Sequence, residues 1–193
     1  MRKKLLVTLL ALSLTAGCIA PVSLVSNQAV VAEAAKKKPK KKTPPTVKKI
    51  YKAVVAKYGD NYLANMKLSK DDIKLRYGIA SSWYTDIIAE IPMMSAHVDT
   101  LIIAKAKNKA GKQKIKKQLT NYRQQLIKDT CQYPMNQLKI QASKVYVKDD
   151  YVFFIMLGSV DSKIEEGGSD EQIIEAYKKE NQKAVSAINA LFK

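Results

Sequence analysis

The pattern of apolar and polar positions changes its period several times along the chain, which predicts a mixture of helices and strands. Apolar residues recur at every third or fourth position over 47–58, and again after Ser169, where Gln172 has the spacing of a capping box. Over 83–91 and over 96–107, apolar and polar residues alternate instead. Alternation is typical of a strand, so these two segments are expected to be strands.

A long helix and a hairpin follow in the second half of the sequence. Positions 112–132 carry one apolar stripe at helical spacing, so this helix is expected to pack on the sheet, and Pro134 is expected to kink or restart it. The β-rich runs 144–147 and 151–157 flank the polar stretch 148–150, which predicts a hairpin with a tight turn. Because the second run is apolar on both faces, we place it centrally in the sheet.

The order of these elements predicts the fold class. Together with a short helix from Ser69 to Gly78, they indicate a single α+β domain over 47–193. We expect an antiparallel sheet of about four strands, packed with a long central helix and with N- and C-terminal helices.

The first part of the chain, 1–34, is expected to be a signal peptide. Arg2, Lys3 and Lys4 precede an uncharged apolar run over 5–16, which is too short to span a bilayer of about 30 Å. This arrangement is typical of a secretory signal. The sequence therefore predicts that the domain lies outside the cytoplasm.

Two cleavage sites compete within this segment. Ala32-Glu33-Ala34 is an A-x-A site, and a cut between Ala34 and Ala35 would release a protein without lipid. Alternatively, Cys18 follows a small pair as in a lipobox and would become a lipidated N-terminus. Both alternatives stay open on the sequence.

A basic linker is expected over 35–46, between the signal and the domain. Six of its lysines fall within seven residues, and its prolines prevent a helix, so it should be extended. These six are Lys36, Lys37, Lys38, Lys40, Lys41 and Lys42. Outside the cytoplasm the abundant polyanions are envelope polymers and the membrane surface, which we expect as partners, and no nucleic acid is expected. The alternative is a solubilising spacer without a partner.

The stretch 83–158 resembles a bacterial family catalogued as domain of unknown function 4358. The resemblance depends on a strand like 97–107, a charged helix like 112–132 with Tyr133-Pro134 after it, and the strand–turn–strand at 145–157. In the turn, Asp150 stands where the family often has glycine. The resemblance implies an α+β fold and an exported or lipid-anchored protein on the outer face of the membrane or wall of a Gram-positive bacterium. It implies no activity, cofactor or catalytic residue.

The candidate catalytic residues are few. His97 is the only histidine, and with Asp86, Glu90 and Asp99 nearby in sequence it suggests a metal ligand or a general base. One histidine cannot form a multi-histidine zinc site, however, and Asp86 and Glu90 fit the solvent-facing side of a strand. Cys131 lies towards the C-terminal end of the long helix, where the helix dipole disfavours a thiolate. We therefore assign no catalytic residue, metal ligand or cofactor.

These observations favour a non-catalytic envelope protein, held at the cell surface by its basic linker and binding or interacting through its domain. The alternative is a hydrolase that acts on an envelope glycan or peptide through carboxylates such as Asp86 and Glu90. A deep cleft with two carboxylates would favour the enzyme.

Overall fold

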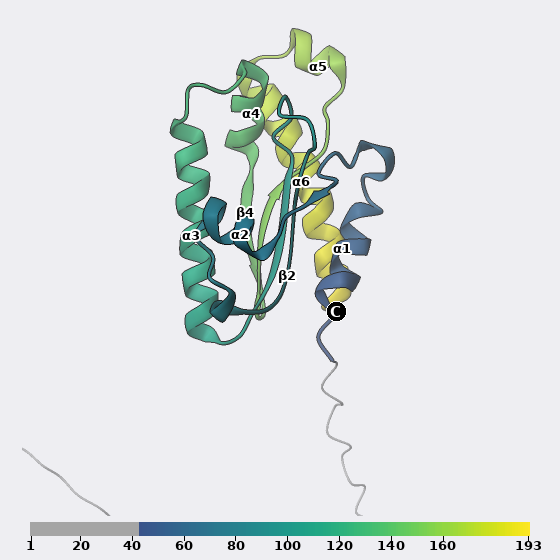
Figure 1. The fold of residues 1–193 in the computed structure, drawn as a ribbon. Coiled ribbons are helices and arrows are strands. Elements are labelled where there is room, and N and C mark those ends of the chain that lie inside the picture. The colour runs from purple at the N-terminus through teal and green to yellow at the C-terminus, as the bar shows by residue number, and fades with distance from the viewer. Residues whose placement is uncertain (1–42) are drawn as a thin grey trace, which may run out of the picture. The chain divides into compact units, whose positions relative to one another are not determined.

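One antiparallel sheet runs through the part of the chain that the computed structural model describes, residues 43–193 (Figure 1). Its strands lie in the order β1-β2-β3-β5-β4, and all neighbours are antiparallel. They are β1 (Met66–Lys67), β2 (Tyr84–Ile91), β3 (Thr100–Ala106), β4 (Lys144–Lys148) and β5 (Tyr151–Met156). The α+β class is confirmed. The fifth strand, β1, was not expected, because two residues are too few to show a period.

Helices cover both faces of the sheet. They are α1 (Val47–Val55), α2 (Lys70–Tyr77), α3 (Lys109–Lys128), α4 (Pro134–Ala142), α5 (Ser162–Gly167) and α6 (Asp170–Leu191), with short 3-10 turns at Gly59–Asn61 and Ser81–Trp83. Helices α1 and α6 lie side by side on one face, and α2 and α3 cover the other (Figure 1). Successive residues of β3 point to opposite cores: Leu101 and Ile103 to α1 and α6, and Ile102 to α3.

Helix α4 contributes to the core beneath α3 and to a third, smaller apolar cluster with α6. Its Ile140 packs in the core beneath α3, whereas Leu138 packs against Ile173 and Tyr177 of α6. Since strand β5 is buried along its whole length and lies between β3 and β4, its predicted interior position is confirmed.

One predicted helix boundary was wrong, and the left-handed residue of the hairpin turn is not the one that stands where the family often has glycine. The long helix ends at Lys128, because Asp129 has an extended ψ of 107° and the residue before Pro134 is also driven out of the helical region. In the hairpin turn, the residue with a positive φ is Asp149 (48°), not Asp150. Aspartate tolerates this conformation better than most residues do, so the tight turn forms.

Side-chain caps fix where the helices begin, and the capping box predicted at Ser169 is confirmed. Thr46 accepts a hydrogen bond from the backbone N–H of Lys49. Ser69 and Ser169 each form a complete capping box, which satisfies backbone N–H groups of the first turn of α2 and α6.

The sheet has two ends, which we call the base and the tip. At the base, the Tyr151 hydroxyl at the start of β5 donates a hydrogen bond to the Pro45 carbonyl, just before α1. At the tip lie the 92–99 loop between β2 and β3, the start of α4, and α5 (Figure 1). At about 3.3 Å per residue, the six residues of β5 separate base from tip by about 20 Å.

The chain divides into two units, 1–41 and 42–193. The predicted signal peptide, its cleavage positions Cys18, Ala34 and Ala35, and the lysines over 36–42 lie outside the described residues. Among the residues that are described, no helix combines the length and the apolar character needed to cross a membrane.

Candidate functional site

A hollow of about 340 Å³ opens at the tip, between the 92–99 loop, α4, α5 and α6. Seven polar or aromatic residues line it: His97, Tyr133, Asn136, Lys139, Ser159, Glu165 and Tyr177. Its size suits a small molecule or a few residues of a peptide. We call it the tip hollow.

Lys139, which lines the tip hollow, forms a buried ion pair with Asp99. Lys139 Nζ lies 2.6 Å from Asp99 Oδ2, and the Asp99 side chain is fully buried. The other carboxylate oxygen, Oδ1, accepts a hydrogen bond of 3.2 Å from the backbone N–H of Gly158. Lys139 Nζ also lies 5.4 Å from the centre of the Tyr177 ring, within the range of a cation–π contact. Both charges therefore have partners within the protein.

Glu165 carries the negative charge of the tip hollow. Its Oε1 accepts a hydrogen bond of 2.8 Å from the Tyr177 hydroxyl. Burial, this hydrogen bond and the negative charge of Glu165 all raise the pKa of Tyr177 above its ordinary value, in that order of size. No lysine or arginine of residues 43–193 forms an ion pair with Glu165. Its charge is thus available to a cationic ligand.

Two buried asparagines hold the walls of the tip hollow in place. Asn136 donates a hydrogen bond of 2.9 Å to the carbonyl of Ala96 and so fixes the 92–99 loop to α4. Asn181 of α6 donates to the carbonyl of Ala142 at 3.0 Å and accepts from the backbone N–H of Leu157 at 2.9 Å. The tip is therefore cross-linked by side chains rather than by secondary structure alone.

Comparison with known proteins assigns the chain to one family. A family model described as Domain of unknown function (DUF4358) matches residues 57–157. The chain belongs to this family. No curated protein and no solved structure matches the chain. The matched DUF4358 segment includes the whole sheet but ends before α5 and α6, so Glu165 and Tyr177 lie outside it.

The structure separates the two carboxylates that the hydrolase alternative named as examples. Asp86 is exposed near the base end of β2, and Glu90 lies four residues along the strand, a rise of about 13 Å. Glu90 is buried and accepts a hydrogen bond of 2.9 Å from the Tyr62 hydroxyl, so its expected place on the solvent-facing side was wrong. A register shift between Tyr84 and Asp86 breaks the simple alternation of β2. This DUF4358 protein therefore does not bring the two carboxylates into one cleft.

His97 and Asp99 take different places at the tip. His97 is exposed and lines the tip hollow, whereas Asp99 is buried beneath it with Lys139.

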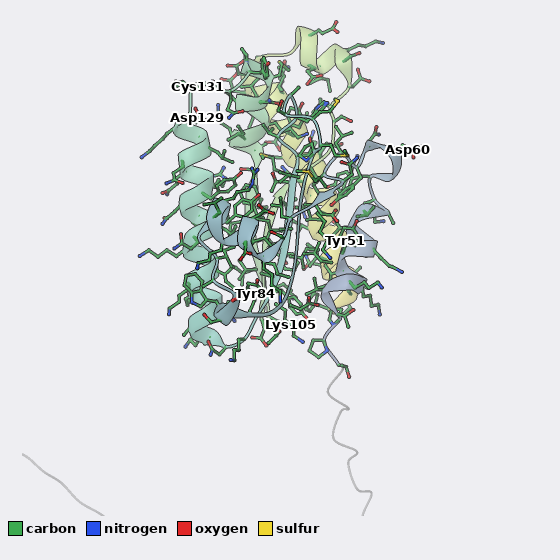
Figure 2. The ribbon with its side chains drawn as sticks, in the orientation of Figure 1. Tyr51, Asp60, Tyr84, Lys105, Asp129 and Cys131 are labelled. Atoms are coloured by element: carbon green, nitrogen blue, oxygen red, sulfur yellow. The ribbon has the colours of Figure 1, made fainter. Side chains whose placement is uncertain are left out.

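Cys131 is exposed just after α3, where its backbone N–H donates to Asp129 Oδ1 at 3.0 Å. Figure 2 places Asp129 and Cys131 at the tip, and Tyr84 and Lys105 at the base. Within residues 43–193, no group of three histidine, cysteine, aspartate or glutamate side chains could hold a metal ion.

Lys139, Glu165 and Tyr177 were not singled out from the sequence. Asn136 and Lys139 are polar residues three apart on a short helix, and they share its buried side with Leu138 and Ala142. Polar residues at core spacing are the signal that could have found them. Glu165 belongs to α5, a helix of six residues that is too short to show a period.

Proposed function

We propose that this DUF4358 protein is a non-catalytic binding module of the cell envelope, attached through its basic linker and binding its ligand in the tip hollow. The observation that carries the proposal is the position of the hollow. It opens at the end of the sheet opposite to Pro45, the point at which the linker reaches the domain. A domain attached at its base would hold the tip hollow away from the surface, facing outwards.

The exposed lysines of the base support an attachment by charge. Lys48 and Lys49 at the start of α1, Lys107 after β3 and Lys109 at the start of α3 are all exposed. They would add to the charge of the linker lysines at 36–42. Close to an anionic surface each lysine contributes on the order of 1 kcal/mol, so a cluster of this kind favours weak, salt-sensitive adhesion.

The contacts of the tip hollow support binding rather than catalysis. Asp99 and Lys139 are held by each other, and Asn136 is held by the Ala96 carbonyl, so these groups shape the walls. Glu165 and the exposed Tyr133 remain to meet a ligand. A carboxylate beside an exposed aromatic ring favours a ligand that carries an ammonium group next to an apolar part, such as an amine-bearing peptide of the envelope.

The attachment is tested by sedimenting the mature chain with vesicles of phosphatidylglycerol. We expect binding at low ionic strength that is lost at high ionic strength. A variant in which the six linker lysines are replaced by serine should bind at least about tenfold more weakly. Vesicles of phosphatidylcholine are the control. Equal binding of both proteins to both vesicles would contradict the attachment.

The ligand site is tested separately, by NMR with short peptides that carry a free amino group. Their addition should shift the resonances of Tyr133, Glu165 and Tyr177, and Glu165→Gln should weaken binding by about tenfold. Glu166→Gln, a change of the exposed neighbour on α5, is the matched control. Equal effects of the two substitutions would rule out the proposed site while leaving the attachment intact.

A further inference from the structure

The methionines of the domain gather at one end of it, the tip. Residues 43–193 contain five, and all five line two neighbouring hollows at the tip that share His97. Met135 lines the tip hollow. The other four, Met66, Met93, Met94 and Met156, line a second hollow of about 380 Å³ on the α2 and α3 side of the 92–99 loop. We call this the methionine hollow.

Three of these methionines are exposed. The exposed fractions are 76% for Met93, 61% for Met94 and 37% for Met66. Methionine is normally among the buried residue types, because its side chain is apolar. Three accessible thioethers around one hollow are therefore not explained by the packing of the domain.

His97 is held next to these thioethers by a β-turn. Its backbone N–H donates a hydrogen bond of 3.2 Å to the carbonyl of Met94, which makes Met94 and His97 the first and last residues of the turn. The Cα atoms at such positions lie within about 7 Å of each other. The two side chains thus start from the two corners of one turn, a short distance apart.

The turn is fixed from both sides. Pro92 restricts the backbone where the loop leaves β2, and the buried Asp99 anchors it where β3 begins. Asn136 holds the carbonyl of Ala96, inside the turn, at 2.9 Å. A loop held in this way loses little conformational entropy when its side chains bind a ligand.

We propose that the methionine hollow binds a soft monovalent metal ion, Cu(I), through Met93, Met94 and His97, with Met66 of β1 lining the same hollow. Thioethers are soft ligands that select Cu(I), and imidazole is also a good ligand for copper. Zinc does not fit, because its sites are built from thiolate, imidazole and carboxylate groups in larger number. The inference goes beyond the proposed binding role and does not depend on it.

A methionine-rich surface also suits an apolar protein partner, because thioether side chains adapt their shape. The single histidine at the corner of the turn favours the metal, since an apolar partner gains nothing from an imidazole. The two roles respond differently to leucine. Met→Leu keeps an apolar contact but removes the sulfur ligand.

The test uses the full chain with Cys18→Ser and Cys131→Ser, because either thiol would bind Cu(I) by itself. Cu(I) is titrated anaerobically in competition with bicinchoninate. We expect one ion per chain, and Met94→Leu and His97→Ala should each weaken binding at least about tenfold. Met135→Leu, on the other side of the loop, is the matched control and should leave the affinity unchanged.

A second measurement reports on the site directly. In protein labelled at its methionine methyl groups, Ag(I) should shift the resonances of Met93 and Met94 and leave that of Met135 in place. The thermal unfolding of each variant shows whether it is folded, and these exposed positions should leave it unchanged. Failure of the thiol-free chain to compete with bicinchoninate, or full binding by Met93→Leu/Met94→Leu/His97→Ala, would overturn the proposal.

Discussion

Two ion pairs at opposite ends of the same sheet are built in opposite ways. At the tip, Lys139 and Asp99 lie 2.6 Å apart with side chains 7% and 0% exposed. At the base, Lys112 and Asp150 lie 3.7 Å apart and are 24% and 70% exposed. An exposed pair loses little water and gains little energy, whereas a buried pair is often no more stabilising than apolar residues of the same size. Stability alone therefore does not explain the buried pair, which fits a role in fixing the walls of the tip hollow.

The largest effect is expected from breaking the buried pair. Lys139→Met removes the one cation among residues 43–193 that forms an ion pair with Asp99, and leaves the carboxylate buried without it. The free energy of unfolding, measured by urea denaturation, should fall by about 3–5 kcal/mol. Asp99→Asn/Lys139→Met, which removes both charges, should recover much of this loss. A single variant as stable as the parent would show that water reaches Asp99.

The second effect tests the cross-link behind the tip. Asn181→Ala leaves the carbonyl of Ala142 and the N–H of Leu157 without their side-chain partner in the buried core. We expect a loss of about 2–3 kcal/mol in the free energy of unfolding. Gln182→Ala, an exposed change on the same helix, should cost less than about 0.5 kcal/mol. Similar losses for the two variants would mean that Asn181 is not a structural link.

A smaller effect is expected at the base. Tyr151→Phe keeps the ring in the core and removes only the hydrogen bond to the Pro45 carbonyl. The loss should be about 1 kcal/mol, the usual net contribution of one hydrogen bond. Amide hydrogen exchange in the first turn of α1 should also become faster, because this bond holds the chain just before the helix. If amide exchange in α1 stayed unchanged, the hydrogen bond to Pro45 would not contribute to the stability of this helix.

The smallest effect is expected at the exposed pair. Asp150→Asn should change the free energy of unfolding by less than about 0.5 kcal/mol. Any difference should disappear in about 1 M salt, where the Debye length falls to roughly 3 Å. If Asp150→Asn lowered the free energy of unfolding as much as Lys139→Met does, the ion pairs at the base and the tip would not differ in the way proposed.

Much of the fold was accessible from the sequence because the signals were local. The capping residues Ser69 and Ser169 lie next to the helices that they start, and the hairpin turn lies between its two strands. The predicted end of the long helix was wrong because the apolar stripe continues past Lys128, where the backbone leaves the helix. Periodicity reports which side of a segment is apolar, and not where its hydrogen bonds stop.

The site was less accessible, because it depends on contacts between distant residues. Asp99 and Lys139 are 40 positions apart, and each alone resembles an ordinary surface charge. Glu90 was predicted on the wet side of its strand, yet Tyr62, which gives it a buried hydrogen bond, lies 28 positions earlier. His97 was considered from the sequence without a role being assigned to it, and its setting among methionines appears only once β1, the 92–99 loop and β5 are brought together.

The pairing of α1 with α6 has a consequence for how the molecule is made. The first helix of the domain packs on the last one, so its apolar side chains Val47, Ile50 and Val54 have no complete cover until the final residues are present. A chain delivered from its amino end cannot close this core while it is still emerging, and must search for it across nearly its whole length. Deletion of the last turns of α6 should therefore first destabilise α1, at the other end of the domain sequence.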